Sequence, residues 1–182
     1  MKCPMHKLPE TITICGTLDL ERFSNSDVDY VVSILDPDFV EPNVFRTFGK
    51  HKRLTLRFHD IVEEVPNLIA PQVHHISELL EFGRTIMAES GRHLLIHCFA
   101  GVCRSTAAAA LLLAQEEPER TPADAVERML QIAPHAWPNV RMIAIGDEIL
   151  NYNNALVDAV ESLYSRMYQL YPEFGRMMTS SI

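Results

Sequence analysis

One segment of the chain joins a short apolar run to an alanine-rich run through a loop of small and polar residues. It reads His97-Cys98-Phe99-Ala100-Gly101-Val102-Cys103-Arg104-Ser105. The apolar run before the loop, 93–97, is typical of a buried strand, and the run after it, 105–117, is typical of a buried helix that ends before Pro118. A loop between a strand and the first turn of a helix presents backbone N–H groups to a small anion. The segment therefore predicts an anion site in a fold that alternates strands with helices.

Further runs along the chain extend this alternation. Four runs rich in β-branched residues have the character of strands and are flanked by turn residues, at 11–15, 30–35, 54–58 and 93–97. Apolar residues at helical spacing predict helices at 71–90, 105–117 and 123–133, and a C-terminal helical segment at 139–176, capped by Asn139, that is either one helix or two. Strands separated by helices imply right-handed crossovers. We therefore expect an α/β fold, in a three-layer α/β/α arrangement with a mostly parallel central sheet of four to five strands.

The size and composition indicate one ordinary globular domain. The chain has 182 residues, of which 47% are hydrophobic and 22% charged, and we expect a single domain over 1–182 with the core around the loop at about 11–150. A formal net charge of −8 argues against nucleic acid as a partner, and the longest apolar run, 107–114, is too short for membrane insertion. Because the N-terminus lacks an apolar leader segment, the expected location is cytoplasmic. The expected oligomeric state is a monomer or a weak homodimer.

Cys98 stands where the strand meets the loop, in the position of a nucleophile. The loop amides, turned inward by a positive φ at Gly101, and the helix dipole favour the thiolate form of Cys98. The guanidinium of Arg104 suits bidentate binding of phosphoryl oxygens, and the Ser105 hydroxyl can stabilise the sulfur as a leaving group. His97 is expected to hydrogen-bond loop carbonyls and so to support the loop. These side chains predict phosphoryl transfer through a covalent sulfur intermediate.

The pattern His97-Cys98-x-x-Gly101-x-x-Arg104-Ser105 resembles the phosphate-binding signature of the cysteine-dependent protein tyrosine phosphatase superfamily. Its position late in an α/β chain resembles the dual-specificity branch of that superfamily. The resemblance implies hydrolysis of phosphomonoesters in two steps, with no metal and no cofactor. The cysteine attacks phosphorus, an aspartic acid protonates the leaving oxygen, and water then releases phosphate.

The resemblance also implies where the general acid lies. In the superfamily the acid follows the strand before the signature, and Asp60 is the matching position after the run 54–58. Such an acid must hold its proton until it passes it to the leaving oxygen. Glu63 and Glu64 are rival candidates, because the loop reads His59-Asp60-Ile61 without the Trp-Pro that precedes the acid in larger tyrosine phosphatases.

The loop side chains indicate which phosphate ester fits. The expected substrate-binding residues are Phe99, Ala100, Gly101, Val102, Cys103 and Arg104. The variable positions carry no lysine, whereas each extra phosphate of an inositol phosphate calls for another cation. This favours the phosphotyrosine of a phosphorylated protein, with dual specificity left open. The alternatives are a phosphatase of phosphoinositides or small phosphate esters, and a module that binds phosphoproteins without turnover.

Other polar features allow more than one interpretation. Cys15 and Cys103 either form a disulfide with an oxidised Cys98 or fill space in the core. The basic segment 46–57 is either a docking patch or a solvated entry to a strand. Cys3 and His6 are spaced like half of a metal site, but the sequence offers no second half, so no metal is expected.

Overall fold

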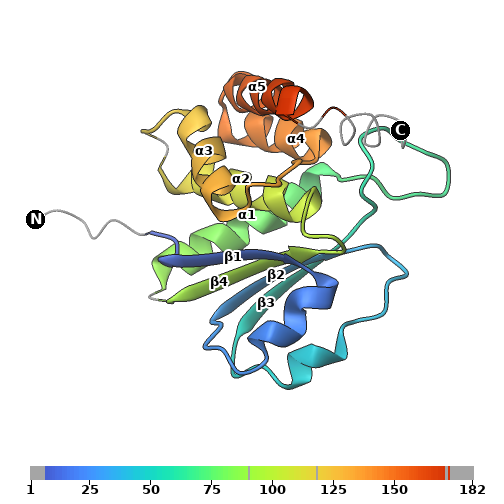
Figure 1. Ribbon diagram of the computed structural model, residues 1–182, viewed down its shortest axis with the longest axis vertical. Helices are drawn as coiled ribbons and strands as arrows, with labels where there is room; N and C mark the ends of the chain where they lie inside the picture. Colours follow the sequence, from blue (N-terminus) through green and yellow to red (C-terminus); the bar gives the residue numbers. More distant parts are fainter. Residues whose placement is uncertain (1–6, 90, 118, 171, 173–182) are drawn as a thin grey trace, which may run out of the picture.

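The centre of the molecule is a four-stranded sheet in which all neighbouring strands are parallel (Figure 1). The structure, a computed structural model, describes residues 7–89, 91–117, 119–170 and 172. In spatial order the strands are β1 (Thr11–Gly16), β4 (His93–Cys98), β2 (Tyr30–Leu35) and β3 (Lys52–Arg57). The predicted α/β class and parallel sheet are confirmed.

The two faces of the sheet are covered in different ways (Figure 1). One face carries α1 (Val73–Ala88), α2 (Arg104–Glu116), α3 (Pro122–Ile132), α4 (Val140–Leu150) and α5 (Ala155–Leu170), and the other carries two 3-10 helices, η1 (Thr17–Phe23) and η2 (Asn43–Arg46). The third layer of the expected arrangement therefore consists of 3-10 helices rather than α-helices. Pro37, Pro42 and Gly49 interrupt the connection from β2 to β3 and limit its helix to a short turn. In the described ranges, every helix is too short or too polar to span a bilayer.

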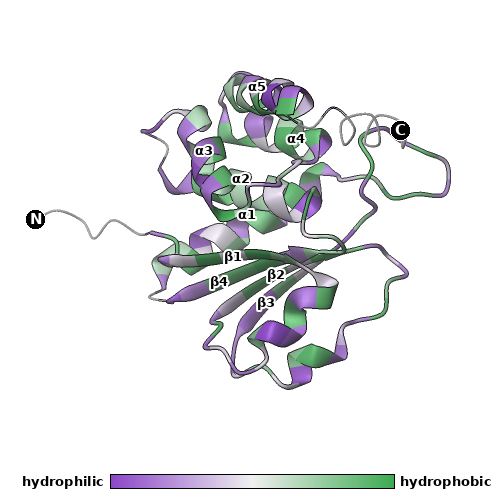
Figure 2. Cartoon of the chain, in the orientation of Figure 1, coloured by the Kyte–Doolittle hydropathy of each residue, from purple (hydrophilic) through white to green (hydrophobic). Residues whose placement is uncertain are grey.

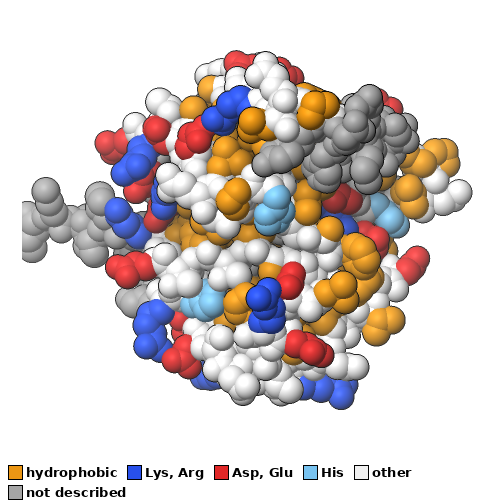
Figure 3. Space-filling model, in the orientation of Figure 1, with side chains coloured by type: hydrophobic (Ala, Val, Ile, Leu, Met, Phe, Trp, Pro, Cys, Tyr) orange, Lys and Arg blue, Asp and Glu red, His pale blue; other side chains and the backbone are white. Residues whose placement is uncertain are grey.

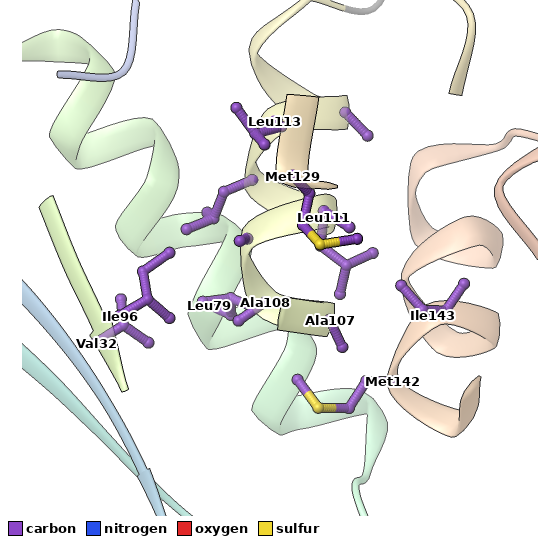
Figure 4. Packing of buried hydrophobic residues seen from close by; sticks show 14 of the residues in the cluster. Val32, Leu79, Ile96, Ala107, Ala108, Leu111, Leu113, Met129, Met142 and Ile143 are labelled. Carbon is purple, nitrogen blue, oxygen red and sulfur yellow. The ribbon is translucent and has the colours of Figure 1, made fainter. Parts of the chain in front are cut away.

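Helix α2 lies at the centre of the helical layer, and every residue from Arg104 to Ala114 is buried. The alanines at 107–110 let neighbouring elements approach closely. Figure 4 shows Ala108 beside Leu79 of α1 and Ala107 facing Ile143 of α4, with Ile96 of β4 on the side of the sheet. In Figure 2 β1 is mostly green, whereas β3 at the other edge of the sheet carries several purple residues. This packing fixes the first turn of α2 against the end of β4.

A smaller hydrophobic cluster closes the opposite face of the sheet. Its buried members are Cys15, Leu20, Val28, Val31, Phe48 and Leu95, and Phe23, Val44 and Phe45 pack against them. These residues come from β1, β2, β4, the two 3-10 helices and their flanking turns. The cluster therefore anchors both 3-10 helices beneath the strands that lead to the loop.

The C-terminal helical segment is two helices rather than one. The chain turns at Asn151, which has a left-handed φ of 59°. The buried carboxylate of Asp147 then accepts hydrogen bonds from the N–H groups of Asn154 at 2.7 Å and Leu156 at 2.8 Å, at the start of α5. One side chain thus joins the end of α4 to the beginning of α5. Residues 171 and 173–176 of the predicted segment lie outside the described residues.

Candidate active site

The predicted anion loop lies at the edge of the sheet where the strands end. Cys98 is the last residue of β4 and pairs in register with Gly16, the last residue of β1. Arg104 begins α2, so residues 99–103 form the connection between strand and helix. In α/β sheets this edge is where ligands bind.

The sulfur of Cys98 is buried and is contacted by one group of its loop and one group of the first turn of α2. The Gly101 N–H donates to Sγ at 3.3 Å, and Ser105 Oγ lies 3.3 Å from the same atom. Gly101 has a φ of +75°, and a Cβ there would come within 2.5 Å of the carbonyl carbon of Cys15. Only glycine both adopts this turn and packs against β1, and the turn is what directs the amide at the sulfur.

The end of β1 also holds the loop backbone. Both the backbone N–H and the hydroxyl of Thr17 donate to the carbonyl oxygen of Phe99, at 2.9 and 3.1 Å. These bonds hold the Phe99 carbonyl, while the side chain of Phe99 stays exposed beside Cys98. The N-terminal strand is thus part of the support of the site.

The guanidinium of Arg104 is 3% exposed and is held by two oxygens from neighbouring strand ends. Its Nη1 donates to Asp36 Oδ1 at 2.6 Å and to the carbonyl oxygen of Phe58 at 2.7 Å. Asp36 follows β2 directly, and Phe58 follows β3 directly. These contacts fix the plane of the guanidinium at the base of the loop, where its remaining N–H groups can meet phosphoryl oxygens.

Asp60 lies on the other side of the same guanidinium. Its Oδ2 is 3.5 Å from Arg104 Nε, and its Oδ1 accepts a hydrogen bond from Asn139 Nδ2 at 2.8 Å. Asn139 is itself buried. Its backbone N–H donates to the carbonyl of Cys103 at 3.2 Å, and its Oδ1 caps α4 by accepting from Met142 N at 3.1 Å. Asn139 therefore links three parts of the chain, namely the loop 99–103, the loop that carries Asp60, and the start of α4.

Glu63 and Glu64, the rival candidates for the acid, have different surroundings from those of Asp60. Glu64 is exposed and pairs with Arg141, whose Nη2 lies 3.0 Å from Glu64 Oε1. Glu63 is exposed on the same loop. Arg141 also donates to the carbonyl of Pro71 at 2.8 Å, so its role is to hold the loop after Asp60. Of the three candidate acids, Asp60 is the one beside Arg104.

His97 points away from the loop, on the face of the sheet that η2 covers. Its Nε2 hydrogen-bonds the hydroxyl of Ser33 on β2, its ring lies 5.5 Å from that of Phe45, and its Nδ1 has no partner in the described part of the chain. The expected hydrogen bonds to loop carbonyls are therefore replaced by a contact with the neighbouring strand, because side chains of a strand project from the sheet rather than along it. Burial lowers the pKa of His97 to about 4, so the imidazole is neutral at pH 7.

The other described cysteines are free thiols, of which Cys15 is buried and Cys103 is partly buried. Burial, with a smaller contribution from Asp19, raises the pKa of Cys15 to about 12. Burial also raises the pKa of Cys103, and the nearby Asp60 carboxylate adds to the effect. Both therefore remain protonated at neutral pH and are poor nucleophiles. Cys3 and His6 lie outside the described residues.

Much of the basic segment 46–57 is neutralised within the chain. Arg53 and Arg57 both pair with Glu41, at 2.7 and 2.6 Å, and Lys52 pairs with Glu89. Arg57 also donates to the carbonyl of Phe39 at 2.7 Å. The segment thus serves mainly to hold the chain after β2 against β3.

Sequence reasoning missed two of the residues that organise this site. Asp36 follows a predicted strand, and a carboxylate at the end of a parallel strand is a signal that could have found it. The sequence predicts Asn139 as a helix cap, which it is, but nothing in its local sequence indicates its bond to Asp60. Among the described residues, no group of three or more His, Cys, Asp or Glu side chains is arranged to hold a metal ion.

Solved structures that share this fold are dual-specificity phosphatases and other tyrosine-phosphatase-like proteins. Human DUSP28 matches with a TM-score of 0.57 and 14% identity, over 88% of this chain and 98% of its own. Tk-PTP in its active form matches with a TM-score of 0.55 and 16% identity, over 83% of this chain and 99% of its own. PTPMT1 in complex with PI(5)P matches with a TM-score of 0.56 and 17% identity, over 81% of this chain and 94% of its own.

At these identities the likeness shows the fold. No protein-family model matches the sequence, and neither does any curated protein. The fold nevertheless agrees with the resemblance carried by residues 97–105, because the solved structures that share it are those of dual-specificity phosphatases and phosphatase-like proteins.

Proposed function

We propose that this chain is a phosphomonoester hydrolase that acts on phosphotyrosine in proteins through a phosphocysteine intermediate. The observation that carries the proposal is the position of the Cys98 sulfur, 3.3 Å from both the Gly101 amide and the Ser105 hydroxyl. A sulfur that receives hydrogen bonds from a strand-to-helix loop is suited to nucleophilic attack on a bound phosphate. The fold shared with phosphatases supports the same chemistry.

In the first step the Cys98 thiolate attacks phosphorus and the bond from phosphorus to the ester oxygen breaks. Asp60, in its protonated form, gives its proton to the leaving phenoxide. The Arg104 guanidinium and the loop amides stabilise the negative charge that spreads over the equatorial oxygens. The products of this step are the free tyrosine hydroxyl and a phosphocysteine.

In the second step water attacks the phosphocysteine and the bond from phosphorus to sulfur breaks. The Asp60 carboxylate accepts a proton from the water, which returns it to the acid form. The Ser105 hydroxyl donates a hydrogen bond to the departing sulfur, 3.3 Å away, and so stabilises the thiolate that leaves. Inorganic phosphate is released, and the enzyme is ready for another cycle.

The character of the loop supports an aryl phosphate as substrate. Phe99 offers an exposed aromatic face beside the nucleophile, and Ala100, Val102 and Cys103 add no cation. A single phosphate is satisfied by the loop and Arg104, whereas a phosphoinositide would bring further phosphates without partners. This reasoning favours phosphotyrosine over phosphoinositides, although PTPMT1, a structural neighbour, is seen with PI(5)P.

The test is turnover of p-nitrophenyl phosphate and of a phosphotyrosine peptide by purified protein, with Cys98→Ser as the variant and Cys3→Ser as the matched control. We expect Cys98→Ser to lose turnover while it still binds the phosphopeptide, and wild type quenched during turnover to carry one phosphate on the peptide that contains Cys98. Turnover by Cys98→Ser would refute the assignment of the nucleophile. Binding of the phosphopeptide by wild type without any turnover would favour the non-catalytic alternative.

A further inference from the structure

We propose that an apolar rim beside Cys98, formed by Leu18, Phe39, Val40 and Phe99, binds aliphatic side chains next to the phosphotyrosine of a protein substrate. The inference rests on the proposed function and defines its substrate more closely. The rim residues come from three separate parts of the chain, and their convergence is the first part of the argument.

Contacts of Phe99 join it to the other two parts of the rim. Thr17, which precedes Leu18, donates two hydrogen bonds to the carbonyl of Phe99. The ring of Phe39 meets the ring of Phe99 edge to face, with centroids 5.7 Å apart. Since Phe99 directly follows Cys98, the rim lies at the entrance of the site. Figure 3 shows hydrophobic side chains at the surface on the side of the molecule toward which the strands run.

Two of the rim side chains are more exposed than every other large hydrophobic side chain among the described residues. Leu18 and Val40 are the two most exposed large hydrophobic side chains, at 93% and 80%, and Phe99 is 55% exposed. Apolar side chains that gather at the surface beside a site mark a place where a partner binds. A small phosphate ester does not reach residues of three segments, so the partner is a chain that extends beyond the phosphorylated residue.

Hydrogen bonds hold the backbone of the rim in place, while the side chains of Leu18, Val40 and Phe99 remain exposed. Arg57 donates to the carbonyls of Asp36 and Phe39 at 3.2 and 2.7 Å and pairs with Glu41. These bonds fix the segment that carries Val40. A surface that is already ordered loses little conformational entropy when a ligand binds. The rim is therefore a prepared contact surface rather than a loose loop.

The charges around the rim are balanced within the chain. The segments 17–20 and 36–42 carry Asp19, Asp36, Asp38 and Glu41, but Asp19 pairs with Arg22, Asp36 with Arg104, and Glu41 with both Arg53 and Arg57. These pairs leave the surroundings of the rim without an excess of positive charge that would bind an anionic membrane surface. A protein segment with aliphatic residues beside the phosphotyrosine is the partner that matches this apolar contact.

The experiment compares kcat/KM on three phosphotyrosine peptides that differ only beside the phosphotyrosine, where they carry Leu and Val, two serines, or two glutamates. Wild type is compared with the double variant L18S/V40S and with the control Leu170→Ser, which removes an exposed leucine from α5 on the other side of the sheet. Activity on p-nitrophenyl phosphate, thermal unfolding, and hydrolysis of a phosphatidylinositol phosphate in phosphatidylcholine vesicles are measured alongside.

We expect wild type and Leu170→Ser to prefer the aliphatic peptide over both the serine and the glutamate peptide by about tenfold. In L18S/V40S the preference for the aliphatic peptide should fall to within about twofold. Unfolding temperature and p-nitrophenyl phosphate activity should stay unchanged. Turnover of p-nitrophenyl phosphate by wild type tests the proposed function by itself.

Three results would overturn the inference while leaving the proposed function intact. The first is a preference for the aliphatic peptide that survives in L18S/V40S. The second is a loss in that variant that is equal on p-nitrophenyl phosphate and on the peptides, which would mean a general defect. The third is faster hydrolysis of the vesicle phosphoinositide than of every peptide, which would assign the rim to a lipid surface.

Discussion

Asp36 Oδ1 lies 2.6 Å from Nη1 of Arg104, and the two side chains differ greatly in their surroundings. The guanidinium is 3% exposed, whereas the carboxylate is 43% exposed. Arg104, which the proposed mechanism needs, is therefore positioned from the solvent side by a residue at the end of another strand. Asp36 does not reach the reacting atoms, so it is a positioning residue for Arg104.

Replacing Asp36 by alanine should lower kcat/KM for p-nitrophenyl phosphate by about 10- to 100-fold, because a guanidinium displaced by about 1 Å no longer matches the phosphoryl oxygens. Asp36→Asn, which still accepts a hydrogen bond, should retain more activity. The measurement is steady-state kinetics, with KM expected to rise more than kcat falls. Wild-type kinetics in Asp36→Ala would show that the Phe58 carbonyl alone positions the arginine.

Asn139→Ser should separate the two roles of Asn139. Serine still caps α4, so the unfolding temperature should stay near that of wild type, whereas Asn139→Ala should cost about 1 kcal/mol of stability. Serine is too short to replace the amide that donates to Asp60. We expect both variants to slow phenyl phosphate hydrolysis more than p-nitrophenyl phosphate hydrolysis. Equal kinetics for Asn139→Ser and wild type would mean that Asp60 needs no tether.

Asp60→Ala should slow esters with poor leaving groups far more than activated ones. Phenyl phosphate needs a proton on its leaving oxygen, and the expected loss is about 100-fold or more, whereas p-nitrophenyl phosphate should lose much less. Glu64→Ala is the matched control, because its carboxylate pairs with Arg141. A larger loss of leaving-group catalysis in Glu64→Ala or Glu63→Ala than in Asp60→Ala would move the acid role to that residue.

The stability of the folded protein should fall as the pH drops from 6.5 toward 4, in part because of His97. Burial lowers the pKa of His97 from 6.5 to about 4, so in this window the unfolded chain binds a proton that the folded chain does not. Protonation then favours unfolding, by about 2 to 3 kcal/mol at the lower end. Denaturant unfolding of wild type and His97→Asn at pH 7 and pH 4.5 gives the comparison. An identical pH dependence of stability in the two proteins would show that His97 does not contribute to the loss of stability at low pH.

The strands and helices were predictable because their signals are local. The run 30–35 became β2 with the same bounds, and the alanine-rich run became α2, since apolar periodicity and turn residues act within a few positions. The 3-10 helices were missed because turns of a few residues leave no periodic pattern. Their formation depends on the cluster around Leu20 and Phe48, which exists only after the sheet has assembled.

The site was predictable where its residues are contiguous. Cys98, Gly101, Arg104 and Ser105 form one motif, so their proximity follows from the chain itself. The bond from Arg104 to Asp36 spans 68 positions, and that from Asn139 to Asp60 spans 79. Such pairs are set by the crossover connections and the order of the strands, which no local pattern of residues specifies.

The close approach of Gly101 to the backbone of Cys15 joins two segments that are synthesised at different times. The first strand leaves the ribosome long before Cys98, whose loop it will support, and Asn139, which holds Asp60, comes later still. In the nascent chain Cys98 therefore lacks part of its surroundings until residue 139 has been added. The candidate site is complete only in the finished domain.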